Sequence, residues 1–218
     1  ESLAAIGELV SSVAHELNNP LTSVIGFAQL LQTLDVQEDI KSDLAIIDSE
    51  ARRCQRIVQN LLGLARQQDL DLASVQVNEM VHRTLELKAY SLRIDNIDTM
   101  VDLDPRLPPV IANPCKLQQA LLNLVNNAHE AMVQSRTGGT LLIRTEAATL
   151  NGRPAVRVSV ADDGPGVPPE VRRRLFEPFI STKRQQNGTG LGLAIARQVA
   201  EECGGRLVLD DAHTPGAK

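Results

Sequence analysis

The chain has 218 residues, of which 43% are hydrophobic and 22% charged, a composition typical of folded globular proteins and not of disordered ones. Its formal net charge of −5 argues against a nucleic-acid-binding surface, and the short basic cluster Arg172–Arg174 fits a solvated helix face. The sequence contains no apolar run long enough for a membrane span, no secretory leader and no CxxC pair. We therefore expect a cytoplasmic fragment without membrane contact of its own, whose full-length parent could still be membrane-anchored.

Residues 1–68 predict a hairpin of two amphipathic helices. In the first helix, apolar residues recur in steps of three, four and seven, at Ile6, Val10, Val13, Leu17, Leu21, Val24 and Leu31. In the second, steps of four and three alternate without a break, at Ile40, Leu44, Ile47, Ala51, Cys54, Val58, Leu61 and Ala65. A short turn at 35–38 makes the two helices antiparallel. Because a two-helix hairpin cannot cover both stripes, we expect a dimeric four-helix bundle, with packing onto the downstream domain as the alternative.

His15 is a candidate nucleophile on the first helix. At about 100° per residue it lies roughly 200° from Val13 and from Leu17, so its imidazole is expected to face water. Glu16 can take a proton from it, which is the arrangement needed to accept a phosphoryl group. Pro20 removes a backbone N–H one turn later and predicts a kink that costs about 3 kcal/mol. The alternative is a solvated His–Glu pair, and the strain beside His15 makes the two interpretations about equal.

After the hairpin the pattern changes to mixed helices and strands, which predicts an α+β layer sandwich. The expected strands are Val75–Val77, Asp98–Leu103, Thr140–Thr145 and Pro154–Ala161, the last two joined by an Asn151-Gly152 turn. The expected helices are 78–93 with Asn78 as a cap, Pro114–Val133 with proline in the first turn, and Leu191–Glu202 stopping at Gly204. Prolines 105, 108 and 109 predict a loop before the long helix.

Three motifs in this domain point to nucleotide chemistry. Asn123 and Asn127 lie one turn apart on the long helix, where neutral amides can bind Mg²⁺ or position a phosphate. The segment 162–166, Asp-Asp-Gly-Pro-Gly, places a carboxylate beside backbone that a flat ring can approach. The segment 188–192, Gly-Thr-Gly-Leu-Gly, leads into a helix whose first N–H groups attract a phosphate. Each alone also fits an ordinary structural role, and the glycine segment is neither a P-loop nor a Rossmann turn.

Taken together, these motifs resemble those of the histidine protein kinases of two-component signalling, over almost the whole chain. The similar segments are Ser12–Leu31 (H-box), Asn113–Met132 (N-box), Asp162–Val167 (G1 box), Phe176–Lys183 (F-box) and Gly188–Leu193 (G2 box). The resemblance implies a dimerisation and histidine-phosphotransfer hairpin at residues 1–68, a linker at 69–73, and a Bergerat-type (GHKL) α/β sandwich ATP-binding domain at 74–218.

The resemblance also implies residue roles. His15 would accept the phosphoryl group with Glu16 as its general base, and Asn19 would orient water when a phosphorylated regulator is hydrolysed. Asn123 would position the phosphates or help to activate the histidine, and Asn127 would hold Mg²⁺. The implied contacts to ATP are Asn123, Asn127, Asp162, Gly164, Gly166, Phe179, Thr182, Lys183, Gly188, Thr189, Gly190, Leu191 and Gly192.

Within that set, Asp162 would accept a hydrogen bond from the adenine amino group, with Gly164 and Gly166 lining the ring. Lys183 would neutralise charge on the γ-phosphate. Phe176 and Phe179 would anchor a lid over ATP, which gives a reason for two of the three phenylalanines to lie in one short segment.

The implied activity is ATP-dependent autophosphorylation of a homodimer formed through residues 1–68. The phosphoryl group would pass to an aspartate of a response-regulator receiver domain that docks near His15, with dephosphorylation of that regulator as a second mode. The alternatives are a nucleotide-binding dimeric scaffold or degenerate kinase, and a conformational ATPase like gyrase, MutL or Hsp90, which carry Glu where this chain has Asn123.

Two departures qualify the resemblance. His129-Glu130 follows the second N-box asparagine where many members have a basic residue, which resembles the nitrogen-sensor-like subgroup. The sequence starts inside one pattern and stops where a closing strand is expected, after Gly216. We therefore expect a catalytic core from a larger protein, lacking the last strand of its ATP-binding domain.

Overall fold

The computed structural model describes residues 2–34, 37–65, 72–135, 138–178, 180, 190–210 and 216–218, with side chains described from Leu17 onward except at 38, 53, 56–57 and 59–65. The chain divides into two compact units, a helical hairpin and an α/β domain. Across the described ranges, no helix combines the length and the apolarity that crossing a bilayer would require.

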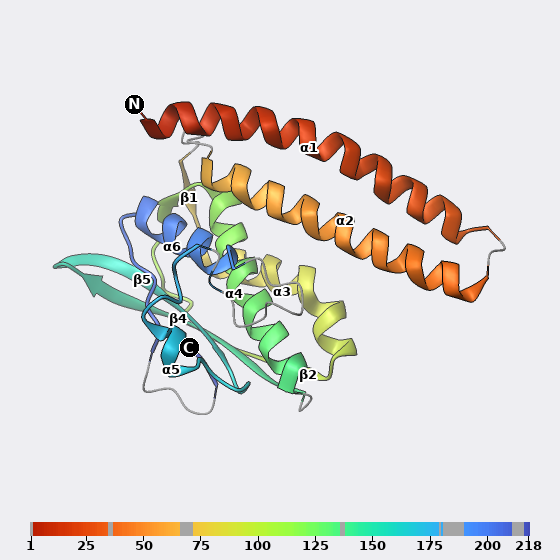
Figure 1. The fold of residues 1–218 in the computed structure, drawn as a ribbon. Coiled ribbons are helices and arrows are strands. Elements are labelled where there is room, and N and C mark those ends of the chain that lie inside the picture. The colour runs from red at the N-terminus through yellow and green to blue at the C-terminus, as the bar shows by residue number, and fades with distance from the viewer. Residues whose placement is uncertain are drawn as a thin grey trace. The chain divides into compact units, whose positions relative to one another are not determined.

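The hairpin consists of α1 (Ser2–Gln32) and α2 (Glu38–Ala65), which lie side by side and run in opposite directions (Figure 1). α1 continues through Pro20 as one helix. Just after Pro20, the hydroxyl of Thr22 donates a hydrogen bond to the carbonyl of Asn18 at 2.8 Å. This bond does not replace the N–H that Pro20 lacks, because the acceptor of that N–H would be the carbonyl of Glu16.

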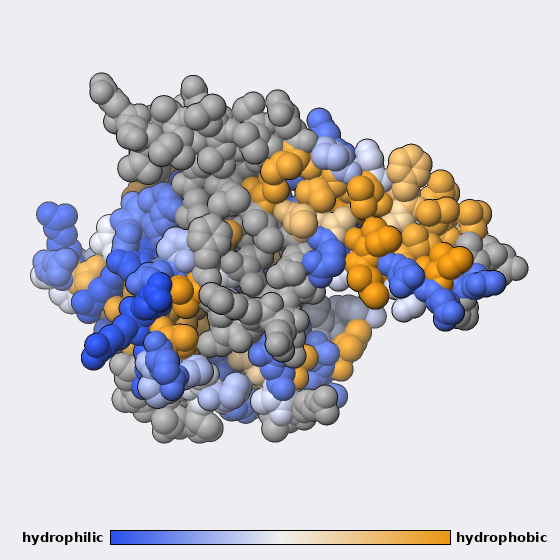
Figure 2. Space-filling model, in the orientation of Figure 1, coloured by the Kyte–Doolittle hydropathy of each residue, from blue (hydrophilic) through white to orange (hydrophobic). Residues whose placement is uncertain are grey.

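Each apolar stripe of the hairpin is partly buried and partly exposed. On α2, Leu44, Ala51 and Val58 are buried, and Leu21 of α1 packs against Val58. The stripe residues that alternate with them stay exposed, with Ile47 at 46%. On α1 the exposed stripe residues are Leu17, Val24 and Leu31. Figure 2 shows apolar side chains gathered over the hairpin. Among the described side chains of the hairpin, one chain therefore leaves part of its seam (the two apolar stripes taken together) uncovered, as expected for half of a four-helix bundle.

The α/β domain confirms the predicted mixed architecture. Its elements are β1 (Ala73–Val75), α3 (Val77–Ile94), β2 (Ile97–Leu103), β3 (Val110–Ala112), α4 (Pro114–Ser135), β4 (Gly139–Leu150), β5 (Arg153–Asp162), α5 (Pro169–Arg172) and α6 (Gly192–Glu202). The main sheet has the order β2-β4-β5, in which β2 runs parallel to β4 and β4 antiparallel to β5. β1 and β3 form a separate antiparallel pair.

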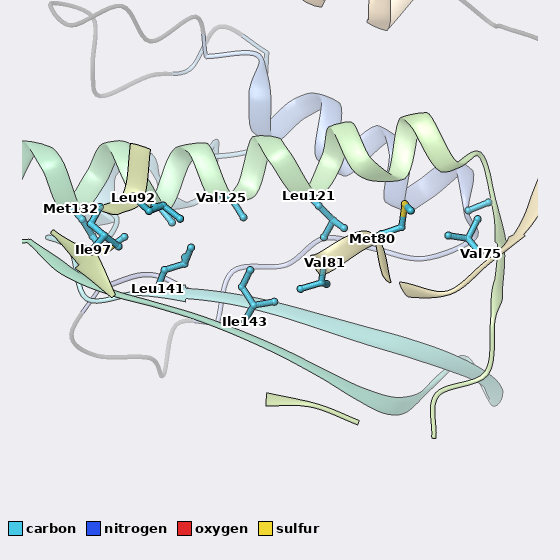
Figure 3. Close-up of a cluster of buried hydrophobic side chains, with 12 residues drawn as sticks. Val75, Met80, Val81, Leu92, Ile97, Leu121, Val125, Met132, Leu141 and Ile143 are labelled. Atoms are coloured by element: carbon cyan, nitrogen blue, oxygen red, sulfur yellow. The ribbon is translucent and has the colours of Figure 1, made fainter. Parts of the chain in front are cut away.

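The core of this domain lies between the helices and the sheet. In Figure 3, side chains of α4 such as Val125 and Met132 face Leu141 and Ile143 of β4 across this layer. Val125, Met132 and Leu141 are completely buried. α3 adds further members to the same cluster, among them Val81. This packing fixes the rotation of α4 about its axis, and with it the direction of the polar residues on its other side.

The prediction that Asn78 caps α3 is wrong. The residue before the helix is Gln76, which makes no side-chain cap, and Asn78 lies inside the first turn. Its amide nitrogen donates to the carbonyl of Asp104 at 2.8 Å, and its amide oxygen accepts from the hydroxyl of Thr145 at 2.8 Å. The side chain therefore joins α3 to the sheet and to the following loop, a long-range use that outweighs the local preference of asparagine for helix caps.

Short elements also differ from the prediction. β1 ends at Val75 and not at Val77, and β3 occupies part of the proline-punctuated segment that was expected to be only a loop. The β4–β5 turn is confirmed: Asn151 and Gly152 have φ angles of 51° and 75°. Two successive left-handed residues are what a type I′ hairpin turn requires.

Candidate functional site

α4 carries Asn123 and Asn127 on the side away from the sheet, since Asn123 lies about half a helical turn from the core residue Leu121 and Asn127 about half a turn from the core residue Val125. Asn127 donates its Nδ2 to the carbonyl of Asn123 at 2.9 Å. The Nδ2 atom of Asn123 is buried and has no hydrogen-bond partner within the described structure. A buried donor without an acceptor is costly, and it indicates a ligand that accepts from it.

The start of α4 is fixed locally. Asn113 precedes the helix, and its Oδ1 accepts a hydrogen bond from the backbone N–H of Lys116 at 3.0 Å. Pro114 is the first helical residue, where its missing N–H costs nothing. At the other side of this helix end, the Lys116 ammonium lies 2.8 Å from a carboxylate oxygen of Glu202 at the end of α6. The Lys116–Glu202 ion pair thus joins the start of α4 to the end of α6.

Asp162 ends β5 and is buried, with 6% of its surface exposed. Its Oδ1 accepts a hydrogen bond from the backbone N–H of Gly164 at 2.9 Å. A methyl group at Gly164 would stand 3.4 Å from atoms of Ala131 on α4, so the loop packs closely against that helix. The carboxylate is thus held in place next to backbone that has no side chain to keep a flat ligand away.

The last residues of the chain also lie beside Asp162. The N–H of Asp162 donates to the carbonyl of Ala217 at 2.9 Å, and the two residues form an antiparallel bridge. Gly166 has a φ of 73°, and a methyl group there would stand 2.9 Å from the carbonyl oxygen of Gly216. Residues 216–218 therefore occupy the edge of β5 where the closing strand was expected to join the sheet.

The described part of the glycine segment, residues 190–192, leads into α6 beside the asparagine pair. Gly190 has a φ of 67°, a left-handed conformation that favours glycine, and Leu191 is completely buried. A methyl group at Gly192 would stand 3.5 Å from Nδ2 of Asn127 and 3.7 Å from Cβ of Asn123. The first N–H groups of α6 therefore lie against the amides of α4.

Several predicted site residues lie outside the described residues: Phe179, Thr182, Lys183, Gly188 and Thr189. The side chains of His15 and Glu16 also lie outside the described set, although their backbone is helical, so the outward direction of the imidazole stays a prediction. Asn19 is described and exposed, and Phe176 is half-buried.

His129 makes a side-chain contact that the sequence did not predict. In the sequence this residue only supports the resemblance to the nitrogen-sensor-like subgroup. His129 is 9% exposed, and its Nε2 lies 2.7 Å from Oδ2 of Asp95, the residue that follows α3. Burial lowers the pKa of the neighbouring Lys88, although the carboxylates of Glu130 and Asp95 act in the opposite direction. The pair fastens the asparagine-bearing helix to the end of α3.

These groups suit one kind of ligand. A fixed carboxylate beside close-approach glycines can accept from the amino group of a flat base, and amides next to a helix N-terminus can bind phosphates with a cation. An α/β domain with this arrangement fits a nucleotide-binding domain.

Comparison with known proteins identifies the family of the chain. Residues 112–218 match the family described as "Histidine kinase-, DNA gyrase B-, and HSP90-like ATPase", and residues 5–70 match the "His Kinase A (phospho-acceptor) domain". The chain belongs to the histidine kinase family.

Individual relatives agree with this assignment. The sensory histidine kinase/phosphatase NtrB of Escherichia coli O157:H7 is 35% identical over 212 residues, which are 93% of this chain and 58% of that protein. Full-length ShkA in complex with AMPPNP superposes with a TM-score of 0.74 at 29% identity, over 93% of this chain and 42% of ShkA. Histidine kinase ThkA, solved in complex with the response regulator TrrA, superposes with a TM-score of 0.67 at 31% identity, over 98% of this chain and 60% of the ThkA chain. The chain thus spans little more than half of NtrB.

Proposed function

We propose that the chain is the core of an ATP-dependent protein-histidine kinase that phosphorylates His15 and transfers the phosphoryl group to an aspartate of a response regulator. In this proposal residues 1–68 are the dimerisation and phosphotransfer hairpin, 69–73 a linker and 74–218 the ATP-binding domain. The observation that carries it is the buried, unpartnered Nδ2 of Asn123, on a side chain that lies beside Gly192 at the start of α6, in the same domain as the fixed carboxylate of Asp162.

The residues present fit ATP with Mg²⁺. Asp162 would accept from the adenine amino group, and Gly164 leaves room for the ring because it has no side chain. Asn123 would donate to a phosphate oxygen, which satisfies its buried amide. Asn127 would offer its amide oxygen to Mg²⁺, a cation that prefers oxygen ligands and is held in such sites by few protein groups together with the phosphates. Bound Mg²⁺ supplies neutralisation of the phosphate charge.

The proposed reaction is an in-line displacement. A neutral imidazole nitrogen of His15 attacks the γ-phosphorus, the bond from that phosphorus to the β–γ bridging oxygen breaks, and ADP leaves. Glu16 takes the ring proton that the phosphorylated imidazole releases. The remaining task of the ATP-binding domain is to position the phosphates and stabilise their charge, through Asn123 and the first N–H groups of α6.

The hairpin supports two kinds of partner. The exposed half of the seam, with Leu17, Val24 and Leu31 on α1, fits a second copy of the same hairpin. A second exposed apolar group, made of Phe27 and Leu30 on α1 and Leu34 just after its end, lies to one side of that seam and follows His15 along the chain. We assign this group to docking of a receiver domain; the solved ThkA–TrrA complex supports a partner of this kind.

Labelling with γ-³²P-ATP tests the proposal. We expect an acid-labile, alkali-stable label that is lost in His15→Gln and kept in His82→Gln, a matched change at an exposed histidine on α3. Phosphate release without labelled protein would instead favour a conformational ATPase. Nucleotide binding with neither label nor release would favour a scaffold.

A phosphatase mode is part of the proposal, because Asn19 is exposed one turn after His15 and NtrB carries both activities in its name. The expected result is that Asn19→Ala keeps autophosphorylation but dephosphorylates a phosphorylated regulator much more slowly than the parent does. Equal dephosphorylation rates would remove Asn19 from this role.

A further inference from the structure

Asp163 makes a contact that the nucleotide-binding roles above do not use. Its Oδ1 accepts a hydrogen bond from the backbone N–H of Thr140 at 2.9 Å. The regular pairing of β4 with β5 ends at Leu141 and Asp162, so Thr140 is the residue of β4 just beyond the ladder. The side chain of Asp163 therefore replaces a main-chain acceptor at this point, and the main chain can turn away from the sheet.

The structure around this contact leaves space for the carboxylate. A methyl group built on Gly139 would collide with Oδ1 of Asp163 and would stand 2.6 Å from Sδ of Met132. Glycine at 139 thus permits a close approach that any other residue would block. Gly139 is held in turn by a backbone hydrogen bond to the carbonyl of Asn96, at 3.4 Å.

The contact lies at the start of the loop that carries the proposed adenine site. Asp162 is fixed by Ala217 through its backbone and by Gly164 through its carboxylate. These bonds hold the start of the loop, and Asp162 is also paired with Leu141 of β4 at the end of the ladder. Beyond that pair, the bond from Thr140 to Asp163 extends the contact between the loop and β4 by one residue. Hydrogen bonds to charged groups are stronger than neutral ones, so this tie matters even at an exposed residue.

We propose that Asp163 is a positioning residue for adenine recognition: by binding the N–H of Thr140 it holds the loop so that Asp162 and Gly164 meet the base. The inference rests on the proposed function, because it assumes that Asp162 accepts from the 6-amino group. A solvated surface carboxylate is the competing interpretation. Asp102 provides the comparison, since it is also exposed and also bonds across the sheet, to Arg144 at 2.6 Å, but lies away from the loop.

The test measures binding of ADP and IDP by titration calorimetry with the full chain and Mg²⁺. IDP carries an oxygen in place of the 6-amino group, so the ratio of the two dissociation constants reports the contact with Asp162. For Asp163→Ala we expect about tenfold weaker ADP binding, little change for IDP, and hence a lower ADP/IDP preference. Asp163→Asn keeps an acceptor oxygen and should restore both the affinity and the preference, and Asp102→Ala should leave both unchanged.

The outcomes separate the inference from the proposed function. If Asp163→Ala keeps the wild-type preference, or loses affinity for both nucleotides equally, the residue has only a structural or solvated role and the inference is wrong. It is also wrong if Asp163→Asn behaves like the alanine variant. If the wild-type chain binds ADP no better than IDP, the adenine assignment of Asp162 fails, and the role of Asp163 fails with it. Thermal denaturation of each variant identifies any loss that comes from unfolding.

Discussion

Replacing Asp162 by Asn gives a sharp test of the site because its geometry demands two acceptors from one side chain. One carboxylate oxygen accepts from the N–H of Gly164 at 2.9 Å, and the proposal requires the other to accept from the adenine amino group. An asparagine amide has only one oxygen. Whichever way it turns, an NH₂ group faces either a backbone N–H or the adenine amino group, and two donors then oppose each other.

The size of the effect follows from the bond that is lost. A hydrogen bond to a charged group contributes about 1.5–3 kcal/mol, so the ADP dissociation constant should rise by roughly 10- to 200-fold. The neighbouring Asp163→Asn change is the matched control, since it removes the same charge but keeps the single acceptor that Thr140 needs. Calorimetric titration with ADP and Mg²⁺ measures both variants. Binding by Asp162→Asn within twofold of the parent, in a protein with unchanged thermal stability, would refute this account of adenine recognition.

Three further outcomes are expected. Val24→Asp should convert the proposed dimer to a monomer in light scattering, whereas Ile46→Asp, on an exposed position off the seam, should leave the protein dimeric. His129→Ala should lower the free energy of unfolding in urea by about 1–3 kcal/mol, because it removes the buried partner of the residue after α3. Partial burial, and secondarily the carboxylate of Glu202, raises the pKa of the Cys203 thiol, so its alkylation by iodoacetamide, followed by mass spectrometry, should have a midpoint at higher pH than that of a free cysteine, and Glu202→Gln should lower this midpoint.

The long elements were predictable because their signals are local. The stripes of α1 and α2, the proline at the start of α4 and the Asn151-Gly152 turn each lie within a few residues of the structure they specify. β3 and α5 are three and four residues long, too short for any periodicity to appear. β3 in particular depends on its pairing with β1, far earlier in the chain.

The residue types of the proposed site can be derived from sequence motifs, but the contacts that support them cannot. Asn123, Asn127 and Asp162 lie in motifs whose spacing predicts a nucleotide site. The contacts that hold them, such as His129 with Asp95 across 34 residues and Asp163 with Thr140 across 23, have no sequence signal because tertiary packing brings these partners together. The prediction that Asn78 caps α3 is wrong for the same reason. The preference of asparagine for helix caps is local, whereas the hydrogen-bond partners of Asn78 are distant in the sequence.

The apolar stripe of α2 is continuous in the sequence but contains two sets of residues with different burial in the structure. Leu44, Ala51 and Val58 are buried, while Ile40, Ile47 and Cys54, at the same seven-residue spacing, are exposed. The two sets lie only about 40° apart around the helix, so the sequence pattern merges them into one stripe. Burial distinguishes the two sets: the buried set packs α2 against α1, and the exposed set is free to contact a second hairpin in the proposed dimer. Substitutions in the first set should therefore unfold the hairpin, whereas those in the second should dissociate the proposed dimer and leave each helix pair intact.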